Sequence, residues 1–208
     1  HAMLCARVFD HSVLHRMAAV SSVPVVNMLS DFAHPLQAVA DVLTMQQSLG
    51  DLAGKTVTYV GDFNNVARSL CEASAMLGMH IRLGCPEGYD AKDNELLGFT
   101  ELGAASVEQY RDIAIAVTGA HAVHTDTWTS MGQESESAER EAIFAGFEVT
   151  NEIMSLADSK AIFMHCLPAH RGQEVSPSVI DGPQSKIYQQ AHNRMHAARG
   201  VLAFLMGV

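Results

Sequence analysis

Short apolar runs alternate with amphipathic stretches along the 208-residue chain. Runs rich in β-branched residues are typical of buried strands, whereas apolar positions three and four apart predict helices. We expect strands at residues 4–9, 23–28, 56–60, 80–83, 122–125 and 161–165. We expect helices at residues 10–19, 34–49, 66–77, 108–118, 137–144 and 189–205. This alternation predicts an α/β fold with a doubly wound, Rossmann-like parallel sheet.

Glycines interrupt the pattern at residues 50–54, between a long helix and the next strand. We place a domain boundary there. The N-terminal unit is short, with two strands, and the main sheet begins after the boundary. Ligands of such sheets bind at the carboxyl ends of the strands, so we look for chemistry there.

Composition narrows the class of protein. Apolar residues make up 48% and charged residues 17%, which is typical of a globular chain. The 13 basic and 23 acidic residues give a net charge of −10, which argues against a nucleic-acid partner. No apolar run approaches the ~20 residues that cross a bilayer, and no signal peptide is evident, so we expect no membrane partner.

The cysteine and histidine patterns favour a cytoplasmic protein without a metal. The four cysteines are scattered and form no Cys-x-x-Cys pair, so we expect reduced thiols. His121 and His124 are three residues apart, and His192 and His196 are four apart, but neither pair has an evident third ligand nearby. We therefore expect no metal site.

Two clusters follow strands of the main sheet. Residues 61–65 form a tight turn whose amides, with the following helix N-terminus, suit a carboxylate or phosphate. A capped turn is the simpler alternative, and Gly-x-Gly-x-x-Gly is absent. In residues 125–132, Asp126 just past a strand end suits an ammonium group, and the Ser-Met-Gly loop offers backbone donors. The alternative is an ordinary loop with one buried tryptophan.

A third cluster, residues 165–172, puts a thiol and a stiffened loop at the sheet edge, with Pro168 as a candidate cis proline. A cysteine nucleophile of a hydrolase is the obvious alternative. His165 precedes Cys166 in a strand and should point to the opposite face, which argues against a simple dyad. At the start of the second helix, His34 and Gln37 suit a carbonyl or amide oxygen, although a cap or surface role is the simpler interpretation.

Taken together, these clusters resemble the ornithine carbamoyltransferases of the aspartate/ornithine carbamoyltransferase superfamily. The His-Cys-Leu-Pro and Asp-x-x-x-Ser-Met-Gly motifs are the most specific, and the second separates ornithine enzymes from aspartate, putrescine and acetylornithine relatives. The matching segments, in the family's order, are Ala6-Arg-Val-Phe9, Pro24-Val-Val-Asn27, His34-Pro-Leu-Gln37, Ala40-Asp-Val-Leu-Thr44, Val60-Gly-Asp-Phe-Asn-Asn65, Thr125-Asp-Thr-Trp-Thr-Ser-Met-Gly132, His165-Cys-Leu-Pro168 and Asn193-Arg194.

The resemblance implies that the δ-amine of L-ornithine attacks carbamoyl phosphate and gives L-citrulline and phosphate. It implies no cofactor and no metal, and it implies a homotrimer that shares sites between subunits. Carried over by position, the carbamoyl-phosphate residues are Arg7, His34, Gln37, Cys166, Leu167 and Arg194. The ornithine residues are Asn65, Asp126, Ser130, Met131, Cys166 and Leu167.

The implied catalytic residues are Asp126, Cys166, Arg194 and His34. The attacking amine must be neutral, yet a free alkyl amine has a pKa near ~10.4. Asp126 and Cys166 beside it would orient it and take up its proton. His34 and the arginines are fixed donors to the oxygen on which charge builds, and losing such a donor typically costs ~3–4 kcal/mol. Cys166 is then an orienting group and not a nucleophile.

The sequence departs from the family in one large respect. Only 33 residues precede His34, and the family's Ser-x-Arg-Thr-Arg phosphate loop occurs nowhere. We therefore expect residues 1–49 to be a remnant of the carbamoyl-phosphate domain with its linking helix, 50–188 the ornithine domain, and 189–208 a helix returning to the first domain. These 208 residues alone should transfer carbamoyl groups negligibly. Exposed apolar surface at the final helix would favour association or swapping.

Two single positions also differ from the residues that are usual in the family. Phe63 replaces the family's usual glycine, so it would be strained at positive φ or would narrow the ornithine pocket. His192 replaces a usual glutamate and could remove a carboxylate that orients Arg194. The alternatives to an ornithine enzyme are a non-catalytic amino-acid-binding or partner module and a carbamoyltransferase for another amine. Both arginine biosynthesis and citrulline breakdown fit the residues.

Overall fold

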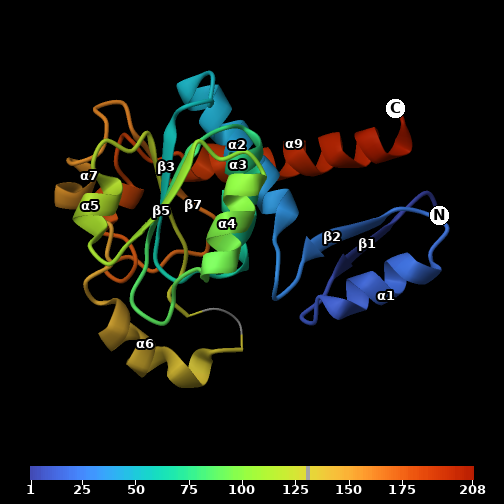
Figure 1. Cartoon of the computed structure of the whole chain (residues 1–208), viewed down its shortest axis with the longest axis horizontal. Helices are drawn as coiled ribbons and strands as arrows, with labels where there is room; N and C mark the ends of the chain where they lie inside the picture. The colour runs from blue at the N-terminus through green and yellow to red at the C-terminus, as the bar shows by residue number, and fades with distance from the viewer. Residues whose placement is uncertain (130–131) are drawn as a thin grey trace.

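The computed structural model describes residues 1–129 and 132–208 (Figure 1). Its strands and helices alternate through most of the chain, as predicted. In chain order they are β1 (Leu4–Arg7), α1 (Ser12–Val20), β2 (Val25–Leu29), α2 (Pro35–Leu49), β3 (Thr56–Val60), α3 (Asn65–Met76), β4 (His80–Gly84), α4 (Asp93–Glu101), β5 (Ser106–Tyr110), α5 (Ile113–Val117), β6 (Ala122–Thr125), η1 (Glu134–Glu136), α6 (Ser137–Phe144), α7 (Asn151–Met154), β7 (Ile162–His165), α8 (Pro177–Ile180) and α9 (Ile187–Met206).

The main sheet has five parallel strands in the order β5-β4-β3-β6-β7. Tyr59 and Met164 face an apolar cluster formed with α2, α3 and α4. Val60 and Phe163 face a second cluster, formed with α5 to α9. Because both faces are covered, every residue of β3 is buried, including Thr56 and Thr58, and its β-branched residues suit such a strand. The predicted doubly wound α/β fold is confirmed.

A second, smaller α/β unit precedes the main sheet. β1 and β2 pair in parallel, with Leu4 opposite Val25, and α1 connects them. Figure 1 shows this unit set apart from the five-stranded sheet, and α2 leads from one to the other. The long helix α9 also extends beyond the sheet, and at its end Phe204 and Val208 are more than four-fifths exposed. The apolar surface expected at this terminus is present.

The predicted helix at residues 108–118 is confirmed only at Ile113–Val117, and its first part is wrong. Residues Ser106–Tyr110 form β5, an edge strand that pairs with β4 alone. The helix begins later, at Ile113, where the Asp112 side chain accepts a hydrogen bond from the amide of Ala114 at 2.8 Å. An edge strand leaves one row of backbone N–H and C=O groups unpaired, and β5 is only partly buried, so its Ser-Val-Glu-Gln-Tyr sequence did not indicate a strand. The sequence patterns also missed α4, η1, α7 and α8.

The described helices include none with the length and apolar character needed to cross a membrane.

Candidate functional site

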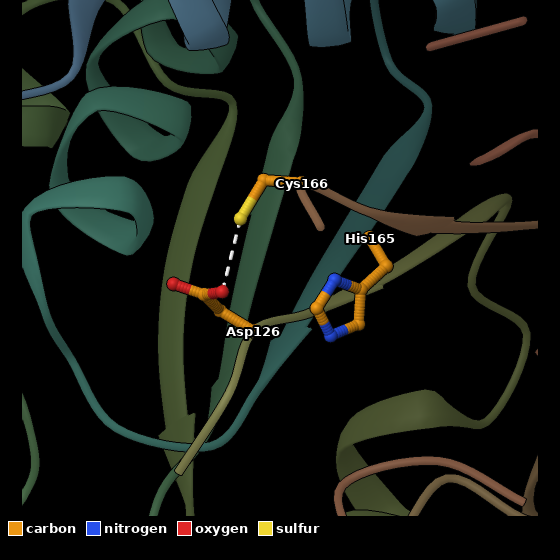
Figure 2. Close-up of side chains that lie close together, drawn as sticks. All are labelled: Asp126, His165 and Cys166. Carbon is orange, nitrogen blue, oxygen red and sulfur yellow. Dashed lines mark hydrogen bonds between the residues drawn. The ribbon is translucent and has the colours of Figure 1, made fainter. Parts of the chain in front are cut away.

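The site lies at the carboxyl ends of three adjacent strands, β3, β6 and β7. Asp126 follows β6, and its side chain is nearly buried. Cys166 follows β7, and its Sγ donates to Asp126 Oδ1 at 2.9 Å (Figure 2). Asn64 lies in the loop after β3, and its Nδ2 donates to Asp126 Oδ2 at 3.0 Å. Each neighbouring strand end therefore supplies one hydrogen bond to the same carboxylate.

Cys166 is held as a thiol. Burial, followed by the charge of Asp126, raises the pKa of Cys166 well above its ordinary value. His165 provides no base, because its Nδ1 accepts from the Leu167 amide at 2.9 Å and its Nε2 lies 3.2 Å from Glu174. The interpretation of Cys166 as a hydrolase nucleophile therefore lacks both a thiolate and a partner base.

His165 is nevertheless closer to Cys166 than strand alternation led us to expect. Polar atoms of Asp126, His165 and Cys166 all lie within 4.8 Å of one another, and they are the one such group of three potential metal ligands among the described residues. Both ring nitrogens of His165 are already hydrogen-bonded. A metal ion at this place would have to displace one of those bonds.

Glu174 supports the loop that carries the thiol. Burial alone would raise its pKa, but hydrogen bonds from His165 and from the His170 amide outweigh burial and hold the pKa below its ordinary value. Within this loop Leu167 has φ +62°, an uncommon conformation for a branched residue, and the Leu167–Pro168 bond is cis as anticipated. A positive φ at a residue as bulky as leucine is unfavourable, and such residues concentrate at functional sites.

Arg194 on α9 faces the same region, next to His34 and Gln37 at the start of α2. Arg194 donates to Gln37 Oε1, and its Nη1 lies 3.4 Å from His34 Nε2. Burial, followed by the charge of Arg194, lowers the pKa of His34 to about 4. His34 is therefore neutral at pH 7, with Nε2 as the acceptor. Its Nδ1–H has no hydrogen-bond partner in the described part of the chain.

Electrostatic contacts join these groups into one region. The charge of Asp126 acts on His34, and the charge of Arg194 acts on Cys166. Arg7 on β1 is exposed, and its charge also acts on His34 and Arg194. Five of the predicted residues thus gather, namely His34, Gln37, Asp126, Cys166 and Arg194, and Arg7 acts electrostatically on two of them, His34 and Arg194.

One predicted ornithine residue, Asn65, has a hydrogen-bond partner outside this group. Asn65 is the first residue of α3, and its Nδ2 donates to the carbonyl of Ser30 at 2.6 Å rather than toward Asp126. Ser130 and Met131 lie outside the described residues.

The structure describes both departures from the family. Phe63 does not have positive φ, so the condition for strain is not met; its ring packs 6.2 Å from that of Phe99 beside the core, and narrowing of the ornithine pocket stays a prediction. His192 is exposed, with its ring 4.8 Å from that of His196. Arg194 is oriented by Gln37 instead of by a carboxylate at position 192.

The sequence patterns missed Asn64 and Arg140. Asn64 looks like any turn residue, and only the start of α3 at position 65 makes it the helix cap. Arg140 on α6 is 3% exposed; it donates to the Trp128 carbonyl at 2.5 Å and pairs with Asp62. It therefore ties the loop after β6 to the loop after β3. No local signal marks such a long-range link.

Comparisons with known proteins cover nearly the whole chain. Residues 53–205 match the aspartate/ornithine carbamoyltransferase Asp/Orn binding domain, and residues 1–47 match the carbamoyl-P binding domain of the same family. An ornithine carbamoyltransferase of Parasynechococcus marenigrum is 48% identical over 207 residues, which are 99% of this chain and 65% of that protein.

Solved structures agree. Ornithine carbamoyltransferase from Pyrococcus furiosus superposes with a TM-score of 0.92 at 44% identity, covering 99% of this chain and 66% of its own. An N-acetyl-L-ornithine transcarbamylase superposes with a TM-score of 0.84 at 27% identity, covering 98% and 68%. The chain thus spans about two thirds of the length of the relatives that it matches.

Proposed function

The chain belongs to the aspartate/ornithine carbamoyltransferase family, and we propose that it serves the transfer of a carbamoyl group from carbamoyl phosphate to the δ-amine of L-ornithine. The products are L-citrulline and phosphate. The observation that carries this proposal is the protonated Cys166 thiol, hydrogen-bonded to Asp126 within electrostatic range of Arg194. This arrangement suits a nucleophile that comes from the substrate rather than from the protein.

On the amine side, the Asp126 carboxylate accepts hydrogen bonds from Asn64 and Cys166, which fix its direction. A carboxylate so placed orients the δ-amine and takes the proton that the amine loses as the new C–N bond forms. Cys166 keeps its own proton and acts as an orienting donor. In this proposal ornithine is also contacted by Asn65, Ser130, Met131 and Leu167.

On the phosphate side, Arg194 and neutral His34 are donors to the carbamoyl oxygen, where negative charge develops. Gln37 holds Arg194 in place. The C–O bond to phosphate then breaks, and Arg7 and Arg194 offset the charge of the leaving phosphate. Nothing in this scheme requires a metal or an organic cofactor.

Ornithine is the amine that the comparisons favour. The ornithine carbamoyltransferases named above are 44–48% identical to the chain, against 27% for the acetylornithine enzyme. One relative, from Pyrococcus furiosus, is named as the anabolic form, which supports arginine biosynthesis as the pathway. We further propose a cytoplasmic homotrimer and the domain limits 1–49, 50–188 and 189–208; the two family matches meet between residues 47 and 53.

A non-catalytic amino-acid-binding or partner module is the second candidate, supported by the match of residues 53–205 to the Asp/Orn binding domain. Incubation with ¹³C-carbamoyl phosphate and either L-ornithine or putrescine separates the two. Citrulline above the uncatalysed background, at the very low rate expected of these 208 residues alone and with no product from putrescine, supports the enzyme. Ornithine binding without citrulline supports the module. A folded chain that binds no ornithine, with or without carbamoyl phosphate, contradicts both.

A further inference from the structure

Asp41 is a buried carboxylate directly behind the site. It lies on α2 and is fully buried. Its Oδ1 accepts two hydrogen bonds of 2.7 Å, one from Gln37 Nε2 and one from Gln190 Nε2. Its Oδ2 lies 3.6 Å from His124 Nε2 and has no hydrogen-bond partner within the described residues. A charge held this deeply is costly, so its retention calls for a specific use.

The two glutamines lead to opposite halves of the site. Gln37 Oε1 accepts from Arg194, on the phosphate side. Gln190 Oε1 accepts from the backbone amide of His165 at 2.9 Å, at the end of β7 and one residue before Cys166. One carboxylate oxygen is therefore linked, through one glutamine each, to the main cation and to the strand end that carries the thiol.

An ionised carboxylate accepts hydrogen bonds but cannot donate them. Both glutamines must therefore turn their NH₂ groups toward Asp41 and their carbonyl oxygens outward. Gln190 uses its NH₂ group a second time, 3.1 Å from His124 Nε2. An asparagine at position 41 offers a donor as well as an acceptor, so either glutamine could turn over. The NH₂ group of Gln37 would then face the guanidinium of Arg194, where neither can accept.

We propose that Asp41 is a positioning residue that orients Gln37 and Gln190, and thereby fixes Arg194 and the Cys166 end of β7 together. The inference rests on the proposed function only for the identity of the two substrates. It predicts that the phosphate side and the amine side of the site loosen together when the charge at position 41 is removed.

The test compares Asp41→Asn with Thr44→Val. Thr44 is also fully buried on α2 and accepts from Asn193 of α9 at 2.8 Å, and within the described residues its hydrogen bonds go to Asn193 and Ala40 rather than to Gln37 or Gln190. Amide hydrogen exchange of His165 reports the amine side without any substrate. The amide of Phe163, two residues earlier on β7, donates to the Gln184 carbonyl and serves as the internal control.

In Asp41→Asn the His165 amide should exchange roughly tenfold faster than in the unchanged chain, while Phe163 keeps its rate. Thr44→Val should leave the His165 rate unchanged. The dissociation constant of carbamoyl phosphate should rise roughly tenfold in Asp41→Asn alone. An unchanged His165 rate in Asp41→Asn, or an equal acceleration in Thr44→Val, overturns the inference. Absence of carbamoyl-phosphate binding in the unchanged chain counts instead against the proposed function, and the exchange rates still decide the role of Asp41.

Discussion

Asn64 joins a helix end to the carboxylate of the site: its Nδ2 lies 3.0 Å from Asp126 Oδ2 and donates to it. Its Oδ1 accepts from the amides of Val66 and Ala67 at the start of α3, at 2.9 and 3.1 Å. The two ends of one amide thus serve two functions. Because the cap fixes which end is the oxygen, Nδ2 is the only end left for Asp126.

Replacing Asn64 by alanine should therefore affect stability and binding together. Loss of an N-cap costs about 1–2 kcal/mol of unfolding free energy. Loss of the bond to Asp126 should weaken L-ornithine binding by roughly tenfold. Urea unfolding and calorimetry measure the two effects. Asp112→Ala removes the cap of α5, which bonds to Ala114, and should lower stability while leaving ornithine binding unchanged. Equal binding losses in both variants would contradict the link.

The thiol of Cys166 should react slowly with iodoacetamide at pH 8, because its pKa is raised by burial and by Asp126. Asp126→Asn removes the charge and lowers that pKa, so alkylation should become at least about tenfold faster. The measurement uses a Cys5→Ser background, since Cys5 is exposed while Cys71 and Cys85 are buried. Rapid alkylation of Cys166 in the unchanged site would show that it is a thiolate.

The pKa of His34 predicts an acid-sensitive fold. Its folded pKa of about 4 lies below the ordinary 6.5. Above pH 6.5 both states are neutral and His34 has no effect. As the pH falls from 6.5 to 4, only the unfolded state gains the proton, so stability falls by about 3 kcal/mol and then levels off. Urea unfolding between pH 7 and pH 4 should show this loss, and His34→Gln should reduce it. If the unfolding free energies of the unchanged chain and of His34→Gln fell in parallel as the pH is lowered, His34 would not be the cause of the loss.

Arg140 should be the most important cation for stability. It is buried against Asp62 and the Trp128 carbonyl, and burial raises the pKa of Asp62 despite the arginine. Arg140→Met leaves that carboxylate without its cation and should cost about 3–5 kcal/mol of unfolding free energy. Arg171→Met breaks an exposed ion pair with Asp181 and should change stability little. Urea unfolding measures both variants, and similar unfolding midpoints for Arg140→Met and Arg171→Met would mean that the buried ion pair is not needed for stability.

The strands of the main sheet were predictable where both faces are buried. β3 was predicted at residues 56–60 and lies there, because a short run of β-branched and aromatic residues between glycines is typical of a buried strand. β5 was not, since an edge strand is specified by its pairing with β4 and not by its own pattern. Strand pairing joins residues that are far apart in the sequence, so a short stretch of sequence does not reveal it.

The sequence predicted which residues form the site better than it predicted which of them contact one another. Asp126 and Cys166 were expected together and lie in hydrogen-bond contact. Between the adjacent asparagines, the resemblance favoured Asn65, whereas Asn64 bonds to Asp126. That choice depends on where α3 begins. Asp41 lay in a segment that matches the family, but the sequence assigned it no role, because a buried acid on an amphipathic helix looks like a surface position until its neighbours are known.

Calorimetric titration of the chain with L-ornithine, in the presence of carbamoyl phosphate, tests the central claim most directly. The account predicts binding at one site, weakened at least about tenfold by Asp126→Asn. Putrescine, which lacks the α-carboxylate, should not compete. A cooperatively folded chain that binds no ornithine, or an Asp126→Asn variant that binds it as tightly, would contradict the account.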